Sequence, residues 1–169
     1  MPFNYVIDAG GPGIYSKEYK NVWYQLGFFN TKLVFYICDC LNPTVNINQG
    51  DLWRIPFVVP NFRQEKLVES LSRQNVEIKK SRCSYSIIEA NYISSPISVG
   101  QDVASSITFT YNTENAFLTQ ILLNESIINK TVFEVYELSE HDKQMVLEKE
   151  GISVGDFSVS SAAKTAYQE

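Results

Sequence analysis

The chain has 169 residues, of which 44% are hydrophobic, and its formal net charge is −5. This composition provides enough apolar side chains for a buried core, so a wholly disordered chain is excluded. The sequence contains neither an apolar window long enough to span a membrane nor a secretory leader, and we therefore expect a cytoplasmic protein without membrane contacts. Three cysteines, an odd number, favour reduced thiols over a disulfide framework.

The charge is divided unevenly along the chain. Residues 1–83 contain ten Lys/Arg and seven Asp/Glu, whereas residues 84–169 contain four and twelve. The two parts therefore carry +3 and −8, which together give the net charge of −5. The positively charged first part is able to bind phosphate groups, and the negatively charged second part would be repelled by them. Solvated helix faces produce the same asymmetry, so charge alone does not decide between a nucleic-acid partner and none.

The first predicted elements are a hairpin and a pair of helices. The hairpin is predicted around the turn Gly10-Gly11-Pro12-Gly13, between Tyr5–Asp8 and Ile14–Tyr15. Apolar residues then recur at three- and four-residue steps, which predicts one helical stripe: Val22, Leu26, Phe29, Leu33, Ile37 and Leu41. Asn30-Thr31 interrupts this stripe, so we predict two helices between Tyr19 and Leu41, with Phe29, Leu33 and Ile37 buried. Pro43 ends the second helix at Asn42.

A polar loop, a strand and a helix are predicted next. The loop leads from Asn42 to Ile55-Pro56, and Phe57-Val58-Val59 is predicted as a short buried strand. Asn61 is the predicted N-cap of an amphipathic helix that runs from Phe62 to about Lys80. The apolar side of that helix is predicted to contain Leu67, Leu71, Gln74 and Ile78.

The remaining elements complete an α+β prediction. Most of Ser81–Ser106 is expected to be loop, and the alternation of Ile107, Phe109 and Tyr111 with threonines predicts a half-buried strand. A long helix opened by Asn112 or Thr113 should follow, then a last helix between Ser139 and Gly151. The predicted fold is thus short strands and a hairpin with several packed helices. The predicted parts are a segment with paired helices at residues 1–60, a helical part with a short strand at 61–156, and a flexible tail at 157–169.

Side chains that could perform chemistry are few. Cys38 and Cys40 are two residues apart on a predicted helix and should point to different faces, and His141 is the only histidine. Because a zinc site needs three or four ligands, we expect no metal centre. A Ser-His-Asp or Cys-His arrangement would have to use His141, which is predicted to lie in an exposed first turn of a helix. We therefore expect no catalytic residue in this chain.

The segment from Leu26 to Pro56 resembles a known signature. It reads Leu-Gly-Phe-Phe-Asn-Thr-Lys, then Leu-Asn-Pro-Thr-Val-Asn, then Gln-Gly-Asp-Leu-Trp-Arg-Ile-Pro. This order is similar to the LLGxLNSK … LNPTxNFQVGDIxxIP signature of large bacterial adenine-specific DNA methyltransferases. The similarity is closest to the phage-growth-limitation (PglX, BREX-type) and type II restriction–modification enzymes. Residues 132–138 show a weaker similarity to a second motif of the family, in which Glu137 replaces the family's glycine. Residues 82–113 match the family poorly.

The resemblance implies a role in target recognition. In that family the segment lies downstream of the catalytic domain, so the chain would be a non-catalytic DNA-recognition portion of a restriction or phage-defence enzyme. Neither the Asp/Asn-Pro-Pro-aromatic motif nor the glycine-rich loop for S-adenosylmethionine occurs here, so we expect no cofactor in this chain. The implied partners are double-stranded DNA and a catalytic methyltransferase region. Lys20, Lys32 and Arg54 are the candidates for phosphate contact. The alternative is an acidic helical protein-interaction module that never touches DNA.

Overall fold

The computed structural model describes residues 19–44, 49–96 and 102–153, which form six helices and no strand. The helices are α1 (Val22–Phe29), α2 (Lys32–Leu41), α3 (Gln49–Trp53), α4 (Phe62–Cys83), α5 (Val103–Val135) and α6 (Glu140–Glu150). The predicted α+β class is therefore wrong for the described residues, which are all-helical. The predicted hairpin at residues 5–15 and the predicted tail at 157–169 lie outside the described residues.

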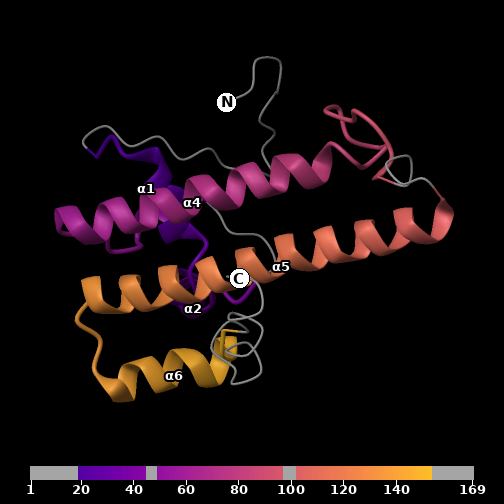
Figure 1. Ribbon diagram of the computed structural model, residues 1–169. Helices are drawn as coiled ribbons and strands as arrows, with labels where there is room; N and C mark the ends of the chain where they lie inside the picture. The colour runs from indigo at the N-terminus through magenta and orange to yellow at the C-terminus, as the bar shows by residue number, and fades with distance from the viewer. Residues whose placement is uncertain (1–18, 45–48, 97–101, 154–169) are drawn as a thin grey trace.

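Two long antiparallel helices, α4 and α5, form the frame of the fold (Figure 1). Helix α1 packs against α4, and α2 contacts both α5 and α6. At one end of the molecule lies an arm, which we define as residues 80–96 and 102–118. It consists of the last residues of α4, the connection that follows them and the first half of α5 (Figure 1). A helix of 33 residues such as α5 is about 50 Å long, which is more than the short helices can cover.

The sharp joint between α1 and α2 is made by side-chain caps. The Asn30 amide Nδ2 donates to the Leu26 carbonyl over 2.8 Å and so closes α1. The hydroxyl of Thr31 donates to the Phe28 carbonyl over 2.8 Å and accepts from the Val34 amide at the start of α2. Both polar side chains satisfy backbone groups that a helix end leaves open. The predicted interruption at Asn30-Thr31 is confirmed.

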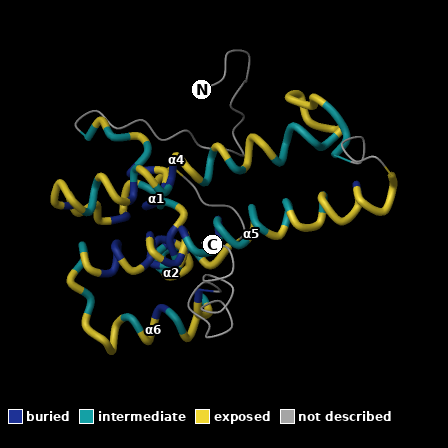
Figure 2. Tube along the Cα trace, viewed as in Figure 1, coloured by how far each residue is buried: buried dark blue, intermediate teal, exposed yellow. Residues whose placement is uncertain are grey.

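The core lies at the α1/α2 end of the frame, where the buried residues gather (Figure 2). Tyr24, Phe28, Val68 and Val132 have no accessible surface, and they bring together α1, α4 and α5. Phe28 stacks on Tyr136 with ring centroids 5.9 Å apart, just after the end of α5. The core therefore depends on residues far apart in the sequence.

The predicted buried face of the first helices is only partly correct. Leu33 is buried, whereas Phe29 and Ile37 are partly buried against the core. In α1 the buried aromatic residues are Tyr24 and Phe28, neither of which belongs to the predicted stripe. The strongly apolar composition of α1 offered more than one helical face, and packing on α4 selected the face with the larger rings.

The predicted strand at Phe57-Val58-Val59 is not formed. Pro56 and Pro60 bracket this segment, and none of the described residues provides a strand to pair with it. The Val58 amide instead donates to the Tyr136 hydroxyl over 3.3 Å, and that hydroxyl donates to the Pro56 carbonyl. The segment is thus a connection held by a side chain that is distant in the sequence.

The predicted strand at Ile107, Phe109 and Tyr111 belongs to α5, and this prediction is also wrong. Helix α5 begins at Val103, capped by Asp102, and not near Asn112. The hydroxyls of the two threonines donate to carbonyls four residues earlier in the same helix. These bonds are Thr108 to Ala104 (2.9 Å) and Thr110 to Ser106 (2.8 Å). Threonines that alternate with apolar residues are therefore compatible with a helix as well as with a strand.

Polar contacts set the register of α4 against α5. Asn124 of α5 is buried, and its Nδ2 donates to Gln74 Oε1 over 2.8 Å and to Asn75 Oδ1 over 2.7 Å. Within the arm, the Arg82 guanidinium pairs with the Glu114 carboxylate at 2.9 Å. Buried polar groups must find partners, so these pairs fix one alignment of the two helices.

Several predicted boundaries agree with the structure. Asn61 caps α4 and forms a reciprocal capping box with Gln64, and Ser139 does the same with Asp142 at α6. Gly151 follows α6 with a positive φ of 76°, a conformation that glycine adopts without strain. The residues that line one side of α4 differ from the prediction, since Val68 and Ser72 are buried and Leu67 is exposed.

Candidate functional site

Described residues of the signature-like segment on either side of 45–48 meet at one corner of the fold. Asn42, at the end of α2, donates through Nδ2 to Asp51 Oδ2 in α3 over 2.9 Å. Ile55 is buried, and the carbonyl of Pro56 accepts from Tyr136. These contacts join the end of α2 to α3, and the connection before α4 to the residue that follows α5. The segment therefore has a structural role that is visible in its own hydrogen bonds.

Gly27 permits the close crossing of α1 and α4. A Cβ atom at this position would lie 2.5 Å from Ser72 Oγ and 2.6 Å from Val68 Cγ1. Both neighbours are buried, so they have little room to move aside. The glycine of the signature-like segment is thus explained by packing between helices.

The three predicted phosphate contacts occupy different settings. Lys32 is engaged inside the fold, because its Nζ donates to the Glu150 carbonyl over 2.8 Å and its backbone amide donates to Asn129 Oδ1 over 2.8 Å. Lys20 is exposed immediately before α1, and Arg54 is exposed just after α3. Lys20 and Arg54 are therefore the two predicted cations that remain accessible to a phosphate.

A cluster of charged side chains holds the start of α1 against α4. The Glu69 carboxylate accepts from Lys66 at 2.9 Å, from Arg73 at 2.9 Å and from Asn21 Nδ2 at 3.1 Å. These hydrogen bonds, first that from Lys66, lower the pKa of Glu69 from its ordinary 4.5 to about 2. Arg73 also lies over the Trp23 ring, 4.5 Å from its centroid.

Changing Glu69 to glutamine should lower the stability of the fold in a pH-dependent way. A carboxylate whose pKa is lower in the folded state stabilises that state above the unfolded pKa, and the effect is lost as the pH falls toward the folded value. The difference in urea midpoint between the wild type and Glu69→Gln should thus be clear at about pH 7 and smaller at about pH 3. Glu77→Gln, which removes an exposed pair with Lys80, is the control and should change neither midpoint. A difference that is equal at both pH values would contradict this account.

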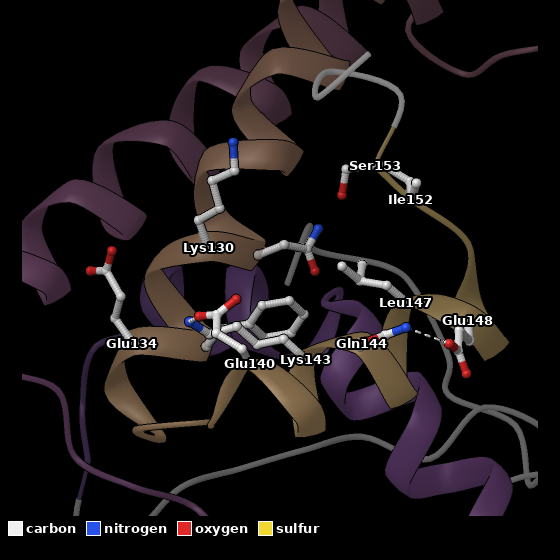
Figure 3. Close-up of a pocket in the computed structure, with 11 residues that line it drawn as sticks. Lys130, Glu134, Glu140, Lys143, Gln144, Leu147, Glu148, Ile152 and Ser153 are labelled. Atoms are coloured by element: carbon white, nitrogen blue, oxygen red, sulfur yellow. Dashed lines mark hydrogen bonds and ion pairs between the residues drawn. The ribbon is translucent and has the colours of Figure 1, made fainter.

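An open groove of about 720 Å³ lies between the end of α5 and α6 (Figure 3). Phe133 and Leu147 contribute apolar surface to it, and Ile152 and Ser153, which follow α6, complete one side. Its volume falls within the range of binding sites for small molecules and short peptide segments. Sequence reasoning missed this groove, because the burial of Phe133 and Leu147 beside one another depends on the turn between α5 and α6.

Charged residues of both signs line the rim of the groove. Lys130 and Glu134 come from α5, and Glu140, Lys143 and Glu148 come from α6 (Figure 3). Lys143 pairs with Glu140 at 2.6 Å, and Glu148 accepts from Gln144 over 2.8 Å. The rim therefore has three carboxylates and two ammonium groups, a balance that is slightly acidic.

The two cysteines of α2 differ in exposure. Cys38 is buried and Cys40 is exposed, which agrees with the prediction that they point to different faces of α2. In the part of the chain that the structure describes, no group of three His, Cys, Asp or Glu is arranged to hold a metal ion. Burial raises the pKa of the Cys38 thiol.

Among the residues that the structure describes, no helix is both long and apolar enough to cross a membrane.

Comparison with known proteins returns no relative. The chain matches no protein-family model, no curated protein and no solved structure.

Proposed function

We propose that the chain is a non-catalytic, DNA-contacting portion of an adenine-specific DNA methyltransferase in a bacterial restriction–modification or phage-defence system. The observation that supports this proposal best is the corner formed by the signature-like segment. Asn42 and Ile55 help to build this corner, and Arg54 beside them stays exposed; Gly27 of the same segment permits the crossing of α1 and α4. Such a corner would present a cation from a rigid support, as a phosphate contact requires. This role places the protein in the cytoplasm.

The proposal gives the helices a positioning task. Phosphate contacts from Arg54 and Lys20 would hold DNA in register while other parts of the enzyme read and methylate bases. Lys32 contributes to this indirectly, through its bond to the Glu150 carbonyl that ties α2 to the end of α6. S-adenosylmethionine would be bound by the catalytic region and not by this chain.

DNA binding by the isolated chain should be weak and only moderately dependent on salt. A basic part that carries only +3 can neutralise few phosphates, and the part that carries −8 opposes it. Each phosphate contact adds about one unit to the slope of log affinity against log salt, so we expect a slope of about two to four. Fluorescence anisotropy with a labelled duplex at several salt concentrations measures this slope.

Arg54→Ala should weaken binding equally on duplexes of different sequence and lower the slope by about one. Lys143→Ala is the matched control, because Lys143 lies on the acidic side and pairs with Glu140. It should leave both the affinity and the slope unchanged. A loss confined to one duplex sequence would instead make Arg54 a reader of bases.

A second candidate function is an acidic protein-docking module without DNA contact. The groove between α5 and α6 favours it, because an apolar floor with an acidic rim suits a segment of protein better than a phosphate backbone. If the chain fails to bind duplex DNA at low salt, and joining the catalytic region does not restore binding, this second function replaces the first.

A further inference from the structure

Another pocket, of about 210 Å³, lies where α1, α4 and α5 meet. Each of the three helices contributes apolar side chains to its lining: Leu26, Val76, Ile121 and Ile128. Ile121 and Ile128 are buried, whereas Leu26 is exposed, so the pocket reaches from the interior to the solvent. A dry apolar cavity of about 150 Å³ is large enough to bind benzene. This pocket therefore has room for a small hydrocarbon group, such as a branched alkyl chain or one ring.

Two opposite charges stand beside this apolar lining. Lys79 comes from α4 and Glu125 from α5, and both residues line the pocket and are exposed. Among the residues that the structure describes, neither charged group takes part in an ion pair or a side-chain hydrogen bond. The next residue of α4, Lys80, is by contrast paired with Glu77 at 2.7 Å outside the pocket. The pocket thus keeps one cation and one anion available to a ligand.

The two charges lie close enough to influence each other. Desolvation raises the pKa of the Glu125 carboxyl, and the positive charges of Lys79 and Lys32 oppose this rise. Glu125 is exposed as a residue, so a ligand from the solvent can still reach its carboxylate even though protein atoms displace part of the surrounding water. A charged group that has lost part of its water gains more from a new partner of opposite charge than a fully hydrated one.

This pair of charges restricts the kind of ligand. A phosphate or a simple carboxylate would be attracted by Lys79 and repelled by Glu125, and for a simple amine the two effects are reversed. A small molecule that carries both an ammonium group and a carboxylate, a few bonds apart, would be attracted by both residues. The apolar lining adds the requirement for a hydrocarbon group beside these two charges.

We propose that this pocket binds a free apolar α-amino acid. The carboxylate of the ligand pairs with Lys79, its ammonium group pairs with Glu125, and its side chain enters between Val76, Ile121 and Ile128. The ligand thereby joins α4 to α5, so its binding stabilises the folded state. This proposal does not depend on DNA binding by the chain.

Isothermal titration calorimetry of the full chain with L-leucine, L-methionine and L-phenylalanine tests the proposal. At least one of the three should bind, and glycine, which has the same charges without a side chain, should bind much more weakly. Leucinamide lacks the carboxylate and N-acetyl-leucine lacks the ammonium group, so each should bind at least about tenfold more weakly than L-leucine. These two compounds also stand for the ends of a peptide, which offer only one of the two charges.

Variants of the chain locate the binding site. Lys79→Met and Glu125→Gln should each weaken the binding by at least about tenfold, because each removes one charged partner. Lys80→Met is the matched control and should leave the affinity unchanged, since Lys80 lies outside the pocket. The double variant Lys79→Glu/Glu125→Lys keeps one charge of each sign and should recover part of the binding, with the two ends of the ligand exchanged. Circular dichroism checks that each variant keeps its helical content.

Three outcomes would overturn the proposal. The first is that none of the three apolar amino acids binds. The second is that leucinamide or N-acetyl-leucine binds as tightly as L-leucine. The third is that Lys79→Met and Lys80→Met change the affinity equally.

Discussion

Phe28→Ala is expected to lower the free energy of unfolding by about 3–5 kcal/mol, the range found when a large buried aromatic side chain is removed from a core. The Phe28 ring has no accessible surface and contacts three other rings, with centroids 5.1 Å away at Phe29, 5.4 Å at Phe57 and 5.9 Å at Tyr136. Its removal leaves a cavity where α1, the connection before α4 and the end of α5 meet. Urea unfolding followed by circular dichroism measures the loss.

The control for this change is Phe62→Ala. Phe62 is the first residue of α4 and is 75% exposed, so its ring contributes little buried area. Its removal should change the stability by no more than about 0.5 kcal/mol. Equal losses at Phe28 and Phe62 would show that the core is not at the junction of α1, α4 and α5.

Gly27→Ala should lower the free energy of unfolding by about 1–3 kcal/mol, although the same change in an exposed helix interior raises it by about 1 kcal/mol. The added Cβ would lie 2.5 Å from Ser72 Oγ, closer than atoms approach without a shift. Helices α1 and α4 must then separate or the side chains must leave their preferred rotamers. Thermal unfolding of the variant and the wild type measures the effect.

Gly50→Ala provides the matched control, because Gly50 also lies in a helix and a Cβ there meets no atom within 4 Å. This variant should be at least as stable as the wild type. In the Gly27→Ala background, Ser72→Ala should restore part of the lost stability, since it removes the nearest atom but leaves the contact with Val68. Stability of Gly27→Ala at the level of Gly50→Ala would refute the close crossing.

Local signals in the sequence determined where α2, α4 and α6 begin and where α1, α2 and α6 end. Asn30-Thr31, Asn61, Ser139 and Gly151 act on backbone groups within a few residues, so their effects are the same in a short peptide as in the fold. The helices predicted from Phe62 and from Ser139 are confirmed for this reason. The sequence predicted less well which side chains of α1 are buried. Helix α1 has apolar residues on several faces, and its packing against α4 determines which face is buried.

The tertiary structure decided the fold class and the candidate sites. Alternating threonines at residues 107–111 and the valines at 58–59 have the local preferences of strands, but a strand also needs a partner, and none of the described residues supplies one. The groove beside Phe133 and the engagement of Lys32 with Glu150 join residues that are distant in the chain. Pairing and long-range packing are properties of the whole fold, and a local pattern of residues does not contain them.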